Sequence, residues 1–426
     1  MSHSESAPID VKAVAKSEPV KFSAGFSKLL NLYLLIGVLT AAYALIFSDA
    51  KHMWGAIYTN IVYWMGIAAG SVMIAVIMQV VHAKWAPPVR RIAEAGISFL
   101  PFALMLLLTS YAGKEQLFFW GHSPMPGREW WMQPTFTYAR NILFLAFLFL
   151  LFRNFVGLAL RRDIGIAKEE AGENSRWASF HYAGFIKKWK GAAEESCEIE
   201  GKLIVWAPIL VALYAVIYSL FSFDMIMGMD PIFFSNMFGG FVFIGNIYAA
   251  WAMLALWVIC MRNSSDDYAE MAGRDKLHDI AKLTFGFSIL WAYLFFSQFL
   301  PIWYANMPEE TQWMILRTRE NPWRLVSWAA FSMCFIIPFI TLLSRDVKRT
   351  PLTLGIVAKI ILIGLWLERY VLIMPQLSPD HIPFNLLEIG FFIGIGGIYG
   401  LSIKSFLEKY PIVALGDPAV KEALAH

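Results

Sequence analysis

The chain has 426 residues, of which 58% are hydrophobic and 16% are charged, and its mean hydropathy is +0.55. A soluble protein carries about a quarter charged residues, so this composition excludes a water-soluble globule. The net charge of +3 is small and its basic residues lie between apolar runs, so no nucleic-acid partner is expected.

The N-terminal residues 1–24 are polar, and we predict a flexible cytoplasmic tail there. A secretory signal peptide would place its apolar stretch nearer the start. A helix of about 20 apolar residues crosses a bilayer. The long apolar runs within residues 25–408 therefore predict an all-α polytopic membrane domain of ten helices. The predicted spans are 29–47, 55–81, 92–112, 134–158, 203–224, 233–261, 277–303, 323–344, 353–374 and 384–406. Residues 409–426 are predicted to form a cytoplasmic C-terminal tail.

The loops between these spans differ in charge. Of the Lys and Arg residues outside the spans, 24 fall on the side of the two termini and five on the other. Basic loops stay in the cytoplasm, so we expect a multi-pass protein of a bacterial inner membrane with both termini cytoplasmic. Loop 159–202 on that side is charged and is predicted to be partly helical. The opposite loops are rich in Trp, Pro and Asn, which indicates either an interfacial aromatic belt or short helices that cap the bundle and dock another subunit.

A weak internal repeat relates spans two to five to spans six to nine. Both sets have the same orientation and the same order of short and long loops. We therefore predict two parallel four-helix bundles, at about 55–224 and 233–374, with two flanking helices and functional groups near the interface. Small residues that would permit close helix approach are Gly66, Gly70 and Ser71 in span two, and Gly239, Gly240 and Gly245 near span six.

Span nine carries three charged residues, Lys359, Glu368 and Arg369. Charges inside spans cost about 2.5–3.5 kcal/mol each on insertion scales, so they are candidate functional groups. Lys359 can extend toward the nearer interface. Adjacent helical residues point about 100° apart, so Arg369 is not expected to pair with Glu368, which needs a partner on another helix or stays protonated. Glu368 therefore serves either proton transfer or an interhelical ion pair.

Other polar residues within or near the spans extend this candidate proton path. Asp224 ends span five, and Arg140 in span four could meet a carboxylate or reach the interface. Glu94 in span three could pair with Arg90 or Arg91. Gln298 in span seven is predicted to hydrogen-bond across helices.

Span seven ends in FSQFLPIWYANMPEET, residues 296–311. Pro308 followed by two acids suits the first turn of a short helix. We predict an interfacial cap there that could receive another subunit. The candidate docking residues are Trp303, Tyr304, Asn306, Glu309 and Glu310.

Cysteine and histidine give no sign of a redox centre in this chain. Cys197, Cys260 and Cys334 form no CxxC or CxxCH motif, and the eight histidines lie in tails, in loops or near span ends. We therefore expect the chain itself to hold no metal or cofactor.

Three stretches resemble a known family: SLFSFDMIMGMDPIFFSNMFGGFVFIGN (219–246), FSQFLPIWYANMPEETQWMILR (296–317) and IPFITLLSRDVKR (337–349). They are similar to ActF, an integral membrane subunit of alternative complex III, the bacterial quinol:cytochrome c or electron acceptor oxidoreductase. These stretches cover about a quarter of the chain, and the ten-span layout extends the resemblance to nearly its whole length. One departure is Ile232-Phe233, where related sequences often have an aromatic residue or a His pair.

The resemblance implies an NrfD-like arrangement of two four-helix bundles and a multisubunit complex. The implied partners are a multihaem cytochrome c, an iron–sulfur protein, an ActC-like membrane subunit of the NrfD or polysulfide-reductase type, small membrane and monohaem subunits, a terminal oxidase and lipids. Haem c and iron–sulfur clusters would belong to these partners, and menaquinol or ubiquinol would be the substrate of the complex. The chain would supply a scaffold, a proton-transfer path or a quinone-side surface. Two alternatives are a stand-alone ion- or solute-coupled secondary transporter and a pure assembly anchor.

Overall fold

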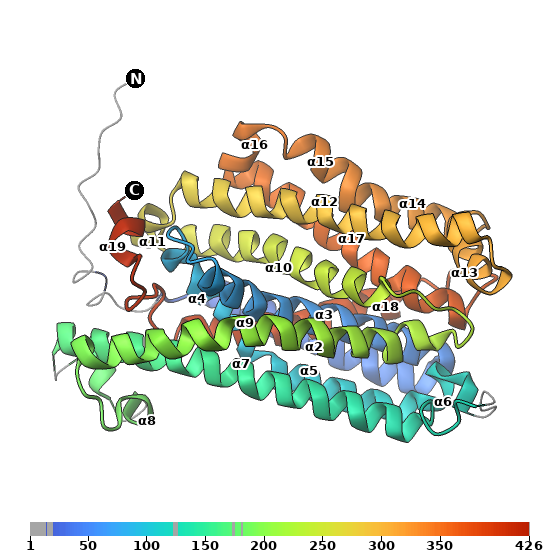
Figure 1. Ribbon diagram of the computed structural model, residues 1–426, viewed down its shortest axis with the longest axis horizontal. Helices are drawn as coiled ribbons and strands as arrows, with labels where there is room; N and C mark the ends of the chain where they lie inside the picture. The colour runs from blue at the N-terminus through green and yellow to red at the C-terminus, as the bar shows by residue number, and fades with distance from the viewer. Residues whose placement is uncertain (1–13, 15–19, 122–126, 173–174, 180–181, 426) are drawn as a thin grey trace.

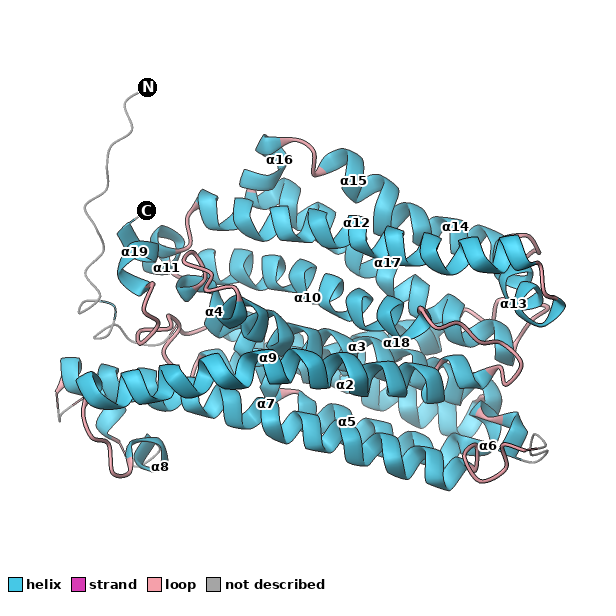
Figure 2. Ribbon diagram, in the orientation of Figure 1, coloured by secondary structure: helices cyan, strands magenta, loops and turns pink. Residues whose placement is uncertain are grey.

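The computed structural model describes residue 14 and residues 20–121, 127–172, 175–179 and 182–425. Every regular element in these residues is a helix, with no strand among them (Figure 2). Nine helical segments of this part of the chain are long and apolar enough to cross a membrane. The chain is therefore an all-α polytopic membrane protein, as predicted. The nine segments are Ala24–Phe47, Ala50–Val80, Pro87–Leu117, Pro134–Ala171, Ala192–Met229, Phe238–Arg262, Arg274–Ala305, Trp323–Thr341 and Leu386–Leu407.

Most of these segments are single helices. They are α2 (Ala24–Phe47), α3 (Ala50–Val80), α7 (Pro134–Ala171), α10 (Phe238–Arg262), α12 (Arg274–Ala305) and α18 (Leu386–Leu407). The third segment is divided into α4 (Pro87–Glu94), α5 (Leu100–Thr109) and α6 (Lys114–Leu117), and the fifth begins with α9 (Ala192–Met225). The eighth comprises α14 (Trp323–Phe331), a π-helical turn (Ser332–Ile336) and α15 (Ile337–Thr341).

A further long helix, α17 (Pro351–Leu377), carries the charges predicted for span nine. It has 27 residues, which gives a length of about 40 Å at 1.5 Å per residue. It packs against α3, α10 and α14 and runs alongside them (Figure 1). Together with α17, the long helical segments of the described residues match the ten predicted spans in order and position.

The two ends of the helix bundle carry different short elements (Figure 1). At the end that we call the termini end, α2 begins and the chain finishes in α19 (Val420–Ala425). The short helices α8 (Ala183–Ile186), α11 (Asp266–Met271) and α16 (Arg345–Arg349) also lie there. At the opposite end, the cap end, lie α6 and α13 (Pro308–Thr318). The predicted basic loops and the predicted aromatic loops therefore fall at opposite ends.

The predicted tail and loop segments are partly described. Most of residues 1–24 lie outside the described part, but Val20 and Phe22 are buried, and the Phe22 N–H donates to Glu408 Oε1 at 3.2 Å. The C-terminal residues pack onto the termini end, where Arg91 Nε donates to the Pro411 carbonyl at 3.0 Å. Loop 159–202 is partly helical as predicted, because α7 continues to Ala171 and α9 starts at Ala192. The division into two bundles stays a prediction.

Close packing of α3 on α10 rests on glycine. A Cβ atom on Gly70 would lie 2.5 Å from the backbone carbonyl oxygen of Asn246, closer than real contacts allow. A Cβ on Gly66 would lie 2.2 Å from Asn246 Oδ1. The predicted close approach is thus present at Gly66 and Gly70. Gly240 makes no such approach, because a Cβ there would lie 3.9 Å from the Leu294 side chain.

The variant Gly70→Ala should destabilise the protein by about 1–3 kcal/mol, because the added methyl group must push α10 away from α3. The measurement is thermal unfolding in mild detergent. The matched control is Gly157→Ala in α7, where an added Cβ meets nothing within 4 Å. Equal unfolding midpoints for the two variants would contradict the tight α3–α10 contact.

Prolines near the cap half of the bundle leave helix carbonyls for side chains to satisfy. Proline has no N–H, so the carbonyl four residues earlier lacks its usual helical donor. Pro375 in α17 leaves the Val371 carbonyl, which accepts from Arg317 Nε at 2.9 Å. In the same way, the Cys334 carbonyl, four residues before Pro338, accepts from the Tyr248 hydroxyl at 2.8 Å. These bonds tie α13 to α17 and α10 to the π-helical turn around the site described next.

Candidate functional site

The candidate site centres on Glu368 in the cap half of α17. Its side chain is buried, and the residue is 5% exposed. Arg369 Nη1 donates to Glu368 Oε1 at 2.7 Å. Arg369 Nη2 donates to the Val242 carbonyl and to Asn246 Oδ1, both at 3.0 Å. The expectation that Glu368 and Arg369 would not pair is wrong, because the long Arg369 side chain, anchored on α10, brings its guanidinium back to its neighbour.

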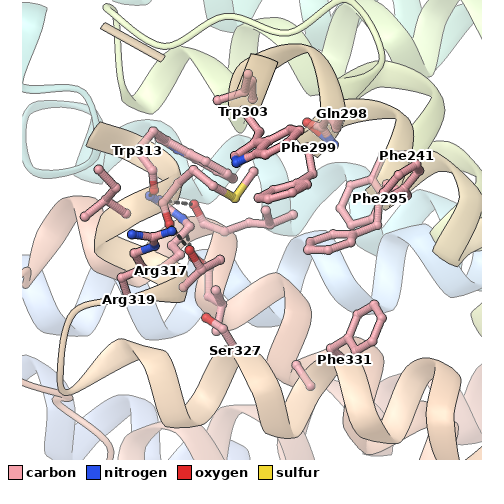
Figure 3. A pocket seen from close by; sticks show the side chains of 18 of the residues that line it. Phe241, Phe295, Gln298, Phe299, Trp303, Trp313, Arg317, Arg319, Ser327 and Phe331 are labelled. Carbon is pink, nitrogen blue, oxygen red and sulfur yellow. Dashed lines mark hydrogen bonds between the residues drawn. The ribbon is translucent and has the colours of Figure 1, made fainter. Parts of the chain in front are cut away.

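The second oxygen of Glu368, Oε2, has no hydrogen-bond partner among the described residues, and Glu368 is one of the residues that line a cavity. This cavity has a volume of about 830 Å³ and lies between α12, α13, α14, α17 and the start of α10. Figure 3 shows Phe241, Phe295 and Phe331 on one side of it and Arg317 and Arg319 on the other. The walls are therefore mostly aromatic, and the polar groups are few.

Four of the residues that line the cavity each have a buried polar atom without a hydrogen-bond partner among the described residues. These atoms are Glu368 Oε2, Gln298 Oε1, Trp291 Nε1 and Ser327 Oγ. The predicted hydrogen bond of Gln298 across helices is therefore not made by its amide oxygen. A buried polar atom without a partner costs about 1–3 kcal/mol, so these four atoms distinguish this region from the saturated ion pairs described below.

Arg317 of α13 supplies a positive charge beside the cavity. Its guanidinium donates to the carbonyls of Val371, Leu372 and Trp313 at 2.9–3.2 Å, and it lies 3.8 Å from the centre of the Trp313 ring. Burial lowers the pKa of Arg317 to about 9, so the group is charged at neutral pH. Three carbonyls use its donors, so Arg317 fixes the position of α13 over the cavity.

Asp224 and Arg140, two further predicted residues, form an ion pair within the first predicted bundle. Arg140 Nε and Nη2 each lie 2.7 Å from one Asp224 oxygen. Asn141 Nδ2 donates to the same carboxylate at 2.8 Å, and the Arg140 guanidinium covers the Trp131 ring at 3.8 Å. Both carboxylate oxygens of Asp224 accept hydrogen bonds, whereas one oxygen of Glu368 has no partner among the described residues. We therefore expect Asp224 to stabilise the fold.

Glu94 lies in a buried charge network at the termini end, away from Glu368. It pairs with both Arg90 and Arg91, as expected, and Arg91 also pairs with Asp163 of α7. Arg90 Nη1 reaches Asp417 of the C-terminal segment at 3.0 Å. The network joins α4, α7 and the C-terminal residues, and its carboxylates are saturated by these donors.

The remaining predicted residues lie at the surface or at the cap. Lys359 is exposed on α17, away from the cavity. Trp303 and Tyr304 are 61% and 86% exposed, and Asn306 ends α12 in a left-handed conformation. Glu309 and Glu310 begin α13, with Glu309 exposed and Glu310 buried. The short helix predicted after Pro308 is confirmed, and its role in docking stays a prediction.

Sequence reasoning missed the buried pair of His52 and Glu388. His52 Nε2 lies 2.7 Å from Glu388 Oε1 and links the start of α3 to the start of α18. Glu388 also accepts from the Asn385 N–H at 2.9 Å in a capping box. The Asn-x-x-Glu spacing at 385–388 was the available signal, because this pattern favours a helix start.

Comparison with known proteins adds no family. The chain matches no protein-family model and no curated protein. Within the described residues, no group of three or more His, Cys, Asp or Glu side chains is placed to hold a metal ion. The site is thus defined by its geometry: a half-paired carboxylate in an aromatic cavity.

Proposed function

We propose that the chain is a membrane subunit of a quinol-oxidising respiratory complex of the alternative complex III type, and that Glu368 transfers protons within it. The observation that carries the proton-transfer role is Glu368 Oε2, which is buried and unpartnered among the described residues, on a residue that lines the cavity. Arg369 holds the other oxygen at 2.7 Å. One oxygen is therefore fixed while the other is open to a proton, a water molecule or a ligand.

The chemistry of quinol oxidation requires such a group. Oxidation of a quinol to a quinone releases two electrons and two protons. In this proposal the electrons pass to iron–sulfur clusters and haem c in partner subunits. A carboxylate that is buried in an apolar wall and open on one side suits acceptance and release of a proton, since burial disfavours its charged form while Arg369 favours it.

The placement of the family-like stretches also supports the proposal. The stretch 296–317 forms the end of α12 and most of α13, and it contributes eleven of the cavity-lining residues. The same stretch leaves Trp303 and Tyr304 exposed at the cap end. This end would receive the cytochrome and iron–sulfur partners, on the side of the bacterial inner membrane opposite the cytoplasmic termini.

A mild-detergent purification of the tagged chain from its native membrane tests the assignment to a complex. We expect co-elution of c-type haem, seen by absorption, with a large iron–sulfur protein and a second ten-span protein, seen by subunit mass. A colourless chain that elutes alone would refute the assignment and favour a stand-alone secondary transporter. Such a transporter would bind its ion or solute without any haem-bearing partner.

A further inference from the structure

The start of α18 is joined to α3 by a histidine–carboxylate pair, whose strength depends on pH. We propose that His52 and Glu388 form a proton-operated clasp, which fastens the cap end of the paired helices α2 and α18 to α3 when His52 is protonated and loosens it when His52 is neutral. The cap end is predicted to face away from the cytoplasm, so the clasp would respond to the pH on that side of the membrane. This inference does not rest on the proposed function.

The helices α2 and α18 form one unit. α2 packs chiefly on α18 and much less on α3. A Cβ atom on Gly394 would lie 2.3 Å from the Cα of Gly37, and one on Gly397 would lie 2.8 Å from the backbone nitrogen of Leu34. The two backbones are therefore in direct contact, which small residues permit. A movement of α18 would carry α2 with it.

This unit is attached to α3 firmly in the middle of the bundle and less firmly at the cap end. In the middle, Trp64 Nε1 of α3 donates to the Phe392 carbonyl at 3.2 Å, and the Trp64 ring lies 5.1 Å from that of Tyr399. At the cap end, the apolar contact is a small cluster separate from the main core, made of Ala44, Met53, Ala56, Leu387 and Phe391. Regions with few buried apolar contacts open more easily, so the cap end depends on its polar contacts.

The clasp itself has one fixed partner and one that can exchange a proton. His52 Nε2 lies 2.7 Å from Glu388 Oε1, in the one ion pair that the described residues form between α3 and α18. The Glu388 side chain is fully buried, and its other oxygen accepts from the Asn385 N–H at 2.9 Å, so the carboxylate is held in place. The His52 side chain keeps 15% of its surface exposed, which gives its proton access to water.

The groups around His52 favour its charged form. Asp49 Oδ2 accepts from the His52 backbone N–H at 3.1 Å, and the Pro383 carbonyl also faces the imidazole. Tyr370 of α17 lies near Glu388, and α2 adds apolar side chains to this junction. A protonated imidazole is attracted by both carboxylates, whereas a neutral one keeps only a hydrogen bond. The fastened state therefore binds the proton more tightly, and its extra stability is present at low pH and lost as the pH rises through the titration of His52.

The test is hydrogen–deuterium exchange of the full-length chain in phosphatidylcholine nanodiscs, read by mass spectrometry over the first turns of α18. The start of α7, at the same end of the bundle, serves as the internal reference. Samples at about pH 5.5 and about pH 8 lie on either side of the usual histidine range, and labelling times are scaled for the intrinsic exchange rate. Relative to the reference, opening of the α18 start should rise about fivefold at the higher pH, because a charged hydrogen bond is stronger than a neutral one by roughly that factor.

Two variants and a control assign the effect to the clasp. His52→Gln and Glu388→Gln should each lose this rise, since neither can form the charged pair, and their positions on different helices guard against a folding defect in either. The matched control is His278→Gln, at the termini end of α12, which should keep the rise.

Three results would overturn the inference. The first is equal protection of the α18 start at both pH values in the unmodified chain, and the second is a pH-dependent opening that survives in His52→Gln. The third is loss of the rise in His278→Gln, which would mean that pH acts on the bundle as a whole. Because the chain is tested alone, each result is independent of whether the chain co-elutes with haem c.

Discussion

Replacement of Glu368 by Gln should leave the complex assembled and lower its quinol-oxidising turnover by about 100-fold, within the range of a positioned proton-transfer group. Glutamine keeps the size of the side chain and can still accept from Arg369 Nη1, which donates to Oε1 at 2.7 Å. It cannot take up and release the proton. The measurement is steady-state turnover of the purified complex, normalised to its haem absorbance.

The matched control for this variant is Glu320→Gln. Glu320 is an exposed carboxyl at the cap end, beyond α13, and it does not line the cavity. Its turnover should equal that of the unmodified complex. Unchanged turnover in Glu368→Gln would mean that the Glu368–Arg369 pair serves packing alone, and loss of assembly in that variant would favour the anchor alternative.

Replacement of Asp224 by Asn should reduce stability strongly and leave normal turnover in the complexes that still assemble. Glu368→Gln, in contrast, is expected to keep assembly and lose turnover. Asp224 accepts from Arg140 through both oxygens, and the pair is buried. Removing one member of a buried pair leaves an uncompensated charge and costs about 3–5 kcal/mol. The measurement is the yield and thermal unfolding midpoint of the chain in detergent.

The control for this second prediction is Asp267→Asn, a carboxyl in the first turn of α11 that is exposed at the termini end. It should unfold at nearly the same temperature as the unmodified chain, because exposed charges contribute little. Asp224→Asn and Asp267→Asn with equal midpoints would show that the Arg140–Asp224 pair contributes little to stability. Reduced turnover per assembled complex would instead give Asp224 a part in proton transfer.

The two carboxylates show how similar positions acquire different properties. Each lies in the cap half of a long helix that closes one of the predicted bundles. Asp224 meets an arginine from α7, 84 residues earlier in the chain, which saturates it. Glu368 pairs with Arg369, whose Nη2 donates to α10, and its second oxygen has no partner among the described residues. The second half of the chain is therefore the half with an open site.

Several features of the fold were predictable because they depend on local sequence. Ten apolar stretches of the right length predicted the long helices, since a helix must match the thickness of the bilayer. Pro308 and the two acids after it predicted the start of α13. Glu368 and Asp224 could be singled out for a similar reason, because an ionisable residue within an apolar run costs free energy on insertion into a membrane whatever the rest of the fold.

The partners of these charges could not be predicted in the same way. The expectation that Glu368 would not meet Arg369 followed from the direction of adjacent side chains on one helix. It failed because Val242 and Asn246 of α10 accept from the guanidinium and hold it in place. Gln298 likewise lacks the predicted bond from its oxygen because α13 and α14 leave a cavity beside it.

The sequence by itself determined the class of the protein, the order and length of its helices and the depth of each charge, because hydrophobic length and charge cost are local properties. The tertiary structure alone decided which charge is saturated and which keeps an oxygen without a partner among the described residues. That distinction depends on side chains from distant helices: Arg140 reaches Asp224, while the aromatic residues of α12 and α14 enclose a cavity beside Glu368. Packing between helices, rather than the composition of any one of them, therefore places the candidate site on α17.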